Sequence, residues 1–572
     1  MSVAHGVPHG DGAQVVARDH VSRRGADGGR SPRGGSIAGA GGRPGRGRVI
    51  AAAVVLAVVA LAAVLLLPPL IAAAAIASVA VIVLLRRFIF TWTAMIISLA
   101  AVIMLVPARR YAIPIPLPFQ LEPYRLVLGI VIIALVVSLI LKPEVRWRPV
   151  AFGWPIGIFL ATIAVSFVVN VTDLANEALI GTAVGGMVQM GFMLAVFFAF
   201  RLLLRSERDA MLLITFITWA GVVVAFFAVV ERMSRFNVFL VLGNFLPLTL
   251  LREGGDVSRA GVARAFGSAQ HPIALAVALC ILIPLAVYLA KYAAWPHNEI
   301  NRRIVYGAAT VLLFGGIMAA ISRTAVVVLA VMFLVTLILH PKVAGVLFAL
   351  ALPVMLLAAA VVPKVFESMV LSFLDVDSLV ASQYTSAGMG GAGRLADLEP
   401  AMAEVEQRPF FGSGFGSRIV IGDDANAFIL DNQFLGTLME TGALGVLGLA
   451  VLLLVPPIML LRFAFTQAAE RRHALLAFAI AVAISGYIAA IFFYDAFGFF
   501  QTFFILCMLL AVGAWLLTEA PRRAVEATGS RADAAASVEA TDADAALARP
   551  STGGPSEHSS SASGALAEAA AR

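Results

Sequence analysis

Long apolar runs separated by short polar segments fill the chain between residues 49 and 517. A helix that crosses a membrane needs about 20 consecutive, mainly apolar residues, and most of these runs approach or exceed that length. The expected spans are 49–67, 69–85, 88–106, 124–141, 151–169, 180–200, 211–230, 272–290, 304–321, 324–339, 343–362, 435–461, 474–493 and 498–517. This pattern predicts an all-α fold, a polytopic transmembrane bundle of about fourteen helices.

Polar sequence is concentrated in the two ends of the chain and in two long intervals between spans, 231–271 and 363–434. The ends, 1–48 and 518–572, carry too few large apolar residues to offset the entropy of ordering, so we expect both to be disordered tails. The predicted organisation is a basic N-terminal tail, a transmembrane region over 49–517 with its large loop at 363–434, and a C-terminal tail.

Basic residues between the spans predict how the chain is oriented. With a cytoplasmic N-terminus, the short outside loops contain only Arg109, Arg110 and Arg323. The short inside loops then contain Arg86, Arg87, Lys142, Arg146, Arg148, Arg201, Arg205, Arg208, Lys291, Arg302, Arg303, Lys342, Arg462, Arg471 and Arg472. This asymmetry follows the positive-inside rule. We therefore expect a multi-pass protein of the cytoplasmic membrane, with both termini in the cytoplasm and both long polar intervals outside.

Composition supports the membrane assignment and argues against several kinds of binding site. The chain is 61% hydrophobic and only 13% charged, about half the charge of a soluble domain. Cys280 and Cys507 both lie inside apolar runs, which indicates neither a disulfide framework nor a thiolate metal site. The arginines of the N-terminal tail suit a cytoplasmic, lipid-facing segment better than a nucleic-acid site.

Four arginines of the outside intervals and span ends are candidates for anion binding. Arg264 precedes a span, Arg323 lies between two spans, and Arg394 and Arg418 flank the glycine-rich part of the large loop. One guanidinium group can bind two phosphate oxygens at once, and it stays charged at every relevant pH. Each contact at about 4 Å contributes about 4 kcal/mol before desolvation, at an effective dielectric constant of about 20. Each arginine could equally be an interfacial side chain whose head group reaches water.

The large loop and its end offer further candidates, each with a structural alternative. Gly414 and Gly416 lie in FFGSGFGS, where backbone amides could approach a ligand or simply form a turn. Asp431 and Asn432 precede a span, so they could cap its helix or, in the case of Asp431, act as a general base. His271 precedes Pro272 at another span and could also be a cap, while Glu440 lies one turn inside its span. A segment near 395–406 has the periodicity of an amphipathic helix.

Several of these pieces resemble the O-antigen ligase and polymerase family of bacterial membrane proteins. Arg264 opens RAFGSAQHP before one span, Arg323 lies in SRTA at another, and Arg394 follows a glycine in the loop. Arg408 then opens RPFFGSGFG, and Asp431 opens DNQFLGTLMETGALG. The resemblance covers residues 85–515, with its specific motifs between 260 and 450.

The resemblance implies a glycosyltransferase that uses a glycan linked to polyprenyl diphosphate on the outer face of the membrane. It requires no cofactor, and no metal if arginines supply the positive charge. The family's phosphate-binding arginines fall on Arg264 and Arg323, with Arg394 as a weaker third. The family's loop histidine falls on Asp431, which departs from the pattern at the proposed base. Arg418, Gly414, Gly416, Asn432 and His271 complete the expected substrate-binding set.

Two other classes of protein compete with this interpretation. A transporter or flippase predicts charged or helix-breaking residues deep in several spans, whereas the middle of the spans here is nearly free of charge. A structural partner in an envelope complex would suit the tails but not explain the placement of Arg264 and Arg323. The sequence does not separate a polymerase, which joins glycan to glycan, from a ligase, which uses another acceptor.

Overall fold

The computed structural model describes residues 91–520, except for 116–119, 142–146, 253–257, 260–261, 376, 378–379, 382–397, 419–430 and 467–469. The expected spans 49–67 and 69–85, the N-terminal tail, nearly all of the C-terminal tail and Arg394 lie outside these residues.

Twelve helices of the described region overlap the twelve remaining expected spans. They are α3 (Trp92–Leu105), α4 (Pro123–Leu141), α5 (Gly153–Val169), α7 (Ile180–Leu203), α8 (Glu207–Ser234), α9 (Pro272–Tyr292), α10 (Glu299–Ala320), α11 (Arg323–Leu339), α12 (Pro341–Val361), α16 (Gln433–Ala464), α17 (Arg471–Ala490) and α18 (Phe500–Thr518). Eight of them are long and apolar enough to cross a membrane, while α3, α5, α11 and the segment Pro123–Leu139 of α4 are shorter apolar helices. The expectation of an all-α, multi-pass membrane protein is confirmed, and the total of fourteen spans stays a prediction.

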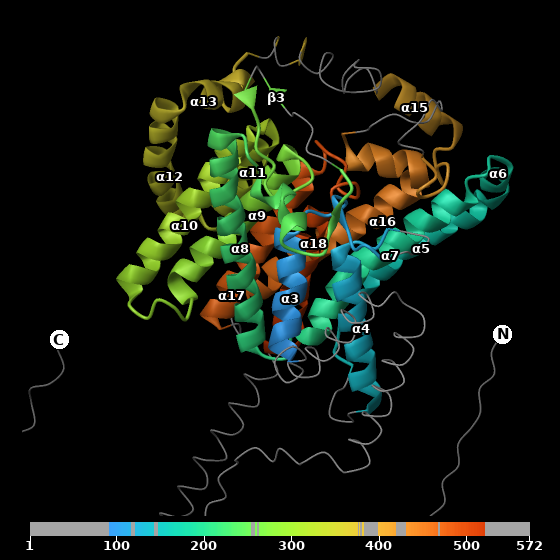
Figure 1. Cartoon of the computed structure of the whole chain (residues 1–572), viewed down its shortest axis with the longest axis horizontal. Helices are drawn as coiled ribbons and strands as arrows, with labels where there is room; N and C mark the ends of the chain where they lie inside the picture. Colours follow the sequence, from blue (N-terminus) through green and yellow to red (C-terminus); the bar gives the residue numbers. More distant parts are fainter. Residues whose placement is uncertain are drawn as a thin grey trace, which may run out of the picture. The chain divides into compact units, whose positions relative to one another are not determined.

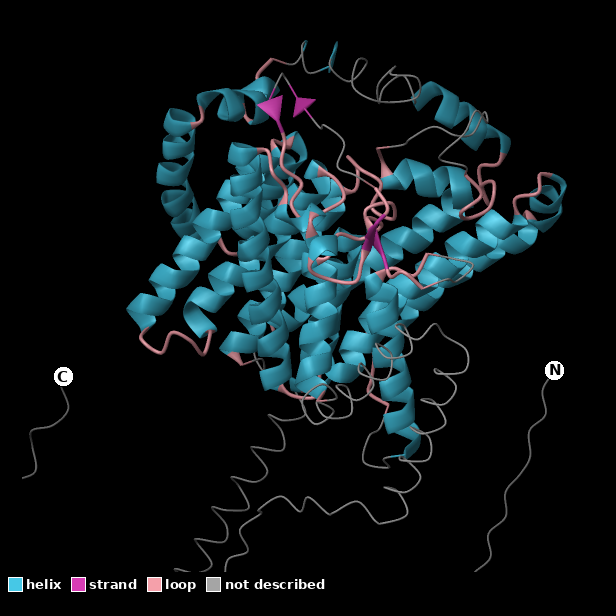
Figure 2. Ribbon diagram, in the orientation of Figure 1, coloured by secondary structure: helices cyan, strands magenta, loops and turns pink. Residues whose placement is uncertain are grey.

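The remaining elements are short and lie between the spans. They are α6 (Val171–Asn176), α13 (Pro363–Met369), α15 (Leu398–Gln407), the 3-10 turns Val238–Leu240, Leu242–Asn244 and Leu371–Phe373, and the strands β1 (Tyr111–Ala112), β2 (Thr249–Leu250), β3 (Ser258–Arg259) and β4 (Val262–Ala263). Strands β1 and β2 pair antiparallel, as do β3 and β4. β3, α13 and α15 lie at one end of the helices, so both long polar intervals meet there (Figure 1, Figure 2). We call this the loop end.

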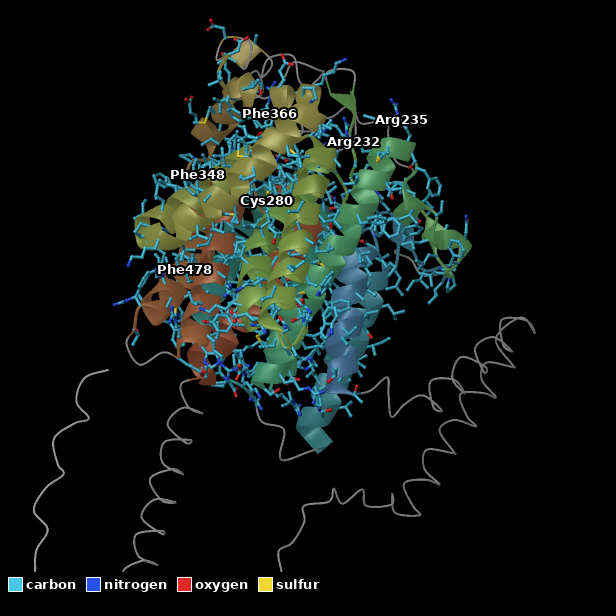
Figure 3. All side chains as sticks on the ribbon, turned by 90° about the vertical axis from the view of Figure 1, so that its left-hand side faces the viewer. Arg232, Arg235, Cys280, Phe348, Phe366 and Phe478 are labelled. Atoms are coloured by element: carbon cyan, nitrogen blue, oxygen red, sulfur yellow. The ribbon has the colours of Figure 1, made fainter. Side chains whose placement is uncertain are left out.

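Burial differs sharply among the spans. α18 and α9 lie in the middle of the bundle, with 94% and 78% of their spans buried, as expected for helices that are apolar on every side (Figure 1). At the edge, α12 has Ala344 as its one buried side chain. Figure 3 places Cys280 of α9 inside, Arg232, Arg235 and Phe366 toward the loop end, and Phe478 toward the other end.

An ion-pair network joins helices at the end away from the loops. Arg201 of α7 is fully buried, and its Nη2 lies 3.3 Å from Oε1 of Glu519, just after α18. Arg148 pairs with the same carboxylate at 2.6 Å. The Nε of Arg201 also donates to the carbonyl oxygen of Pro149. Because a buried cation needs such partners, this network ties α5, α7 and α18 together.

The amphipathic segment expected near 395–406 contains helix α15, which buries one side. Ala401 and Val405 pack against Met439 of α16, whereas Leu398 and Met402 are exposed. The large loop is therefore anchored to α16 through this helix.

Helix α16 consists of two halves that meet at Gly442, where φ is 65° and ψ is −168°. The loop fills the break, because Ser413 and Gly414 donate backbone N–H groups to the carbonyls of Met439 and Glu440 at 3.0 and 2.8 Å. Beyond Gly442, Ala443 donates to the carbonyl of Pro409 at 2.8 Å. Backbone N–H and carbonyl groups that the break leaves without helical partners are thus hydrogen-bonded by the loop.

We expect G442A to destabilise the protein by about 2 kcal/mol or more, because φ is positive there and a Cβ would overlap the backbone of Phe410. Thermal unfolding of the purified protein in detergent measures this change. The matched control is G157A in α5, where a Cβ meets no neighbour within 4 Å. Equal melting temperatures for both variants would contradict this account of the break.

Candidate functional site

Arg264 lies beside the break between α10 and α11. Its Nε donates to the carbonyl oxygen of Ala320 at 3.0 Å, and the next residue, Ala265, donates its N–H to Ala319 at 3.1 Å. α10 ends at Ala320 because Ile321 adopts a left-handed conformation with φ 46°. The segment that follows β4 therefore completes the C-terminal end of α10, where carbonyls lack helical partners.

Arg323 lies at the other side of the same break, as the first residue of α11. Its Nε donates to the carbonyl oxygen of Ser368 in α13 at 3.3 Å. Two arginines that are far apart in the sequence are thus brought to one junction at the loop end. The start of the large loop, α13, therefore contacts this junction through Ser368.

His271 is the N-cap of α9. Its Nδ1 accepts the N–H of Ile273 at 3.2 Å, and its ring stacks on Phe499 with 5.5 Å between centroids. Pro272 follows at the first helical position, which suits a proline.

The glycine-rich segment Phe410–Ser417 packs tightly against two helices. Gly414 has φ 106° and Gly416 has φ 73°, so both occupy conformations that favour glycine. A Cβ on Gly416 would lie 3.0 Å from the Cα of Gly186 in α7. The N–H of Gly414 is already bonded to α16, and that of Gly416 donates to Oε2 of Glu440 at 3.3 Å. Close packing thus accounts for these glycines.

Arg418 lies against the first turns of α16, where a Cβ on Gly436 would be 3.6 Å from its Nη1. The helix N-cap is Asn432, whose Oδ1 accepts the N–H groups of Phe434 and Leu435 at 2.9 and 3.2 Å. Asp431, half-buried, immediately precedes this cap. The capping oxygen therefore belongs to Asn432, and Asp431 lies one residue further toward the loop.

Asp495, in the turn between α17 and α18, is a charged residue of the loop end that the sequence analysis missed. Its Oδ1 accepts the N–H groups of Phe497 and Gly498 at 3.1 and 2.9 Å. Burial raises the pKa of this carboxyl, and the nearby guanidinium groups of Arg418 and Arg109 oppose the shift. Its signal in the sequence was a single acid in a short gap between two apolar runs.

Arg109, before α4, is a second charged residue that gained no role from the sequence. Its guanidinium carbon lies 4.2 Å from the ring centre of Phe500. Burial lowers its pKa, and Glu122 and Asp495 oppose that shift. Asp495 therefore interacts electrostatically with one arginine from each of two loops, Arg109 and Arg418.

Residues 308–450 match the family described as O-antigen ligase. The chain carries an O-antigen ligase domain. This match confirms the resemblance drawn from the motifs, and it includes Arg323, Asp431 and Glu440, whereas Arg264 precedes it. The O-antigen ligase family indicates a membrane enzyme that transfers glycans, with a lipid-linked glycan and an acceptor as its general partners. No curated protein matches the chain.

Asp495 generates a prediction about pH. Because the pKa of Asp495 is raised in the folded protein, the folded protein holds this proton more tightly than the unfolded chain does. The contribution of Asp495 to stability is then present at low pH and is lost as pH rises above about 4, the ordinary pKa of aspartate. An asparagine oxygen can still accept both N–H groups, so we expect D495N to be more stable than wild type at pH 7 and to lose this advantage toward pH 4. Melting temperatures of both proteins across that range test this, and a difference that is constant with pH would contradict it.

Proposed function

We propose that this protein is a membrane glycosyltransferase that transfers or polymerises a glycan from a polyprenyl diphosphate carrier on the outer face of the cytoplasmic membrane. The observation that carries the proposal is the meeting of Arg264 and Arg323 at the α10–α11 break. A lipid-linked donor places its diphosphate at the end of the bundle and its tail among the apolar helices. A pair of guanidinium groups at a helix junction of this kind suits that diphosphate.

In the proposed reaction, Arg264 and Arg323 bind the diphosphate and stabilise the negative charge that develops as it leaves. A hydroxyl of the acceptor attacks the anomeric carbon of the donor, and the bond between that carbon and the phosphate oxygen breaks. Polyprenyl diphosphate departs with the electron pair, and the hydroxyl proton passes to a base.

Asp431 is the base that we propose. The family's loop histidine falls at this position, and a carboxylate can also accept a proton. Its support in the structure is local: Asn432 supplies the helix cap, so the Asp431 side chain is not needed for that role.

The other loop-end residues would bind the glycan parts of donor and acceptor. Polar groups at the loop end, near Arg264 and Arg323, come from Arg418, Asn432 and His271. We propose that Arg394, in the part of the loop outside the described residues, also belongs to this set. Gly414 and Gly416 would act by shaping the loop, since packing already occupies their backbone. The arginine distribution in the sequence supports an outer location for this end and cytoplasmic termini.

The first test is R264A in a strain that lacks the gene. We expect glycan transfer to fall at least about 100-fold, because a group that stabilises charge in the transition state typically contributes that much. Analysis of surface polysaccharide and lipid-linked glycans measures transfer, and membrane fractions show that the variant is still inserted. Arg303 is the matched control, because it pairs with Glu299 on the exposed surface and R303A should transfer as wild type does.

The lipid-linked species that accumulates separates the possible activities. Single repeat units would indicate a polymerase, and long chains that never reach an acceptor would indicate a ligase. If neither species builds up in the deletion strain and R264A complements it fully, the glycosyltransferase is rejected and a transporter or flippase for a polysaccharide or lipid precursor is favoured.

A second test concerns the base. We expect D431N to lose at least about 100-fold in transfer, because an amide does not accept a proton near neutral pH. D431H restores the family's histidine and should retain transfer. Initial rates of transfer in membranes, measured from pH 5 to 9, compare the three proteins. Equal rates for wild type and D431N would remove Asp431 from the mechanism.

A further inference from the structure

Glu231, in the last turn of α8, binds the backbone of the segment that carries Arg264. It is buried, with 7% of its surface exposed. Its Oε1 accepts the N–H of Phe266 at 3.2 Å, and its Oε2 accepts the N–H of Gly267 at 2.9 Å. Two successive backbone N–H groups form a concave site for an anion, and here a side chain of the protein itself occupies it.

The geometry of this contact requires a carboxylate. Both oxygens accept, so a glutamine would place its amide N–H₂ against one of the two backbone donors. Gly267 has φ 53°, the left-handed conformation that turns consecutive N–H groups toward one side. A Cβ there would also lie 3.1 Å from Val224. The backbone turn and the glutamate are therefore matched to each other.

Further contacts hold the same segment before and after the two N–H groups that Glu231 binds. Asn237 donates from Nδ2 to the carbonyl of Gly267 at 3.0 Å, and Arg232 donates to the carbonyl of Ala263. Arg110 donates to the carbonyl of Gln270 at 3.0 Å, and its guanidinium carbon lies 4.6 Å from the ring centre of Phe266. The backbone is thus bonded immediately before Arg264, at Ala263, and immediately after it, at Ala265, and the side chain of Arg264 extends to the carbonyl oxygen of Ala320.

We propose that Glu231 is a positioning residue that holds the backbone after Arg264 so that this arginine reaches the α10–α11 break in the orientation that binds diphosphate. The inference rests on the proposed function, since it assigns Glu231 a role through Arg264. Glu231 itself does not touch the substrate. A carboxylate would repel the diphosphate if it were exposed, and its burial against two N–H groups and near Arg110 removes that conflict.

The test is equilibrium binding of farnesyl diphosphate to the purified full chain in detergent, with farnesol as the probe that lacks phosphates. We expect E231Q to raise the Kd for farnesyl diphosphate about tenfold, because a displaced Arg264 would lose one well-placed interaction with the diphosphate. Farnesol has no phosphates, so its binding should stay unchanged. The matched control is E519Q, which removes a carboxylate from the ion-pair network at the opposite end and should leave Kd unchanged.

A merely structural role gives a different result. If Glu231 only stabilises the fold, E231Q reduces the number of binding sites and the melting temperature, but the sites that remain have the wild-type Kd. N237A provides a second variant in case E231Q does not fold, because it removes the neighbouring bond to Gly267, and we expect it to raise Kd about threefold. A wild-type Kd in whichever of these variants folds would overturn the inference.

A double-mutant comparison separates this inference from the function on which it rests. If Glu231 acts through Arg264, then E231Q added to R264A should change Kd less than about twofold. A full tenfold effect in the R264A background overturns the inference alone, because Glu231 would then act by another route. If R264A binds farnesyl diphosphate as wild type does, the proposed diphosphate site fails, and the inference fails with it.

Discussion

Inside a membrane no water is available to bond a helix that is interrupted, so every break must find partners within the protein. Two breaks at the loop end meet this requirement in the same way. The loop segment before Arg418 supplies donors and acceptors to α16 around Gly442, and the segment after β4 supplies Arg264 and Ala265 to the last carbonyls of α10. Both polar intervals are thereby bonded to the bundle at the loop end, where the candidate site residues lie.

Several charged groups at the loop end have neighbours of opposite sign. Asp495 lies near Arg109 and Arg418, and Glu440 of α16 lies near Arg418. Burial of any one of these groups alone would be costly, whereas neighbours of opposite sign reduce the cost. Asp495 and Glu440 therefore offset the charges of Arg109 and Arg418, whereas the proposed diphosphate-binding arginines, Arg264 and Arg323, are held through backbone carbonyls.

The apolar runs predicted the helices well because a membrane imposes one length and one composition on every span. The arginines at span ends could also be recognised in the sequence. Arg264 and Arg323 could be selected because few basic residues lie in the loops that the sequence predicts to be on the outer side of the membrane. Their meeting at one break could not be predicted, since it depends on the left-handed turn at Ile321 and on the pairing of Ala265 with α10. Glu231 and Asp495 were missed for a related reason: their partners are backbone N–H groups, which no sequence pattern reveals.

The glycine-rich loop shows how function and packing can share one motif. Its glycines allow close contact with α7 and α16, so their immediate role is to bring the loop backbone into the break at Gly442. That contact holds the first half of α16, which begins at Gln433, directly after Asp431 and Asn432. A displacement of the loop would break these bonds to the half-helix, which begins directly after Asp431 and Asn432. The precision of the proposed base thus depends on residues that need touch no substrate.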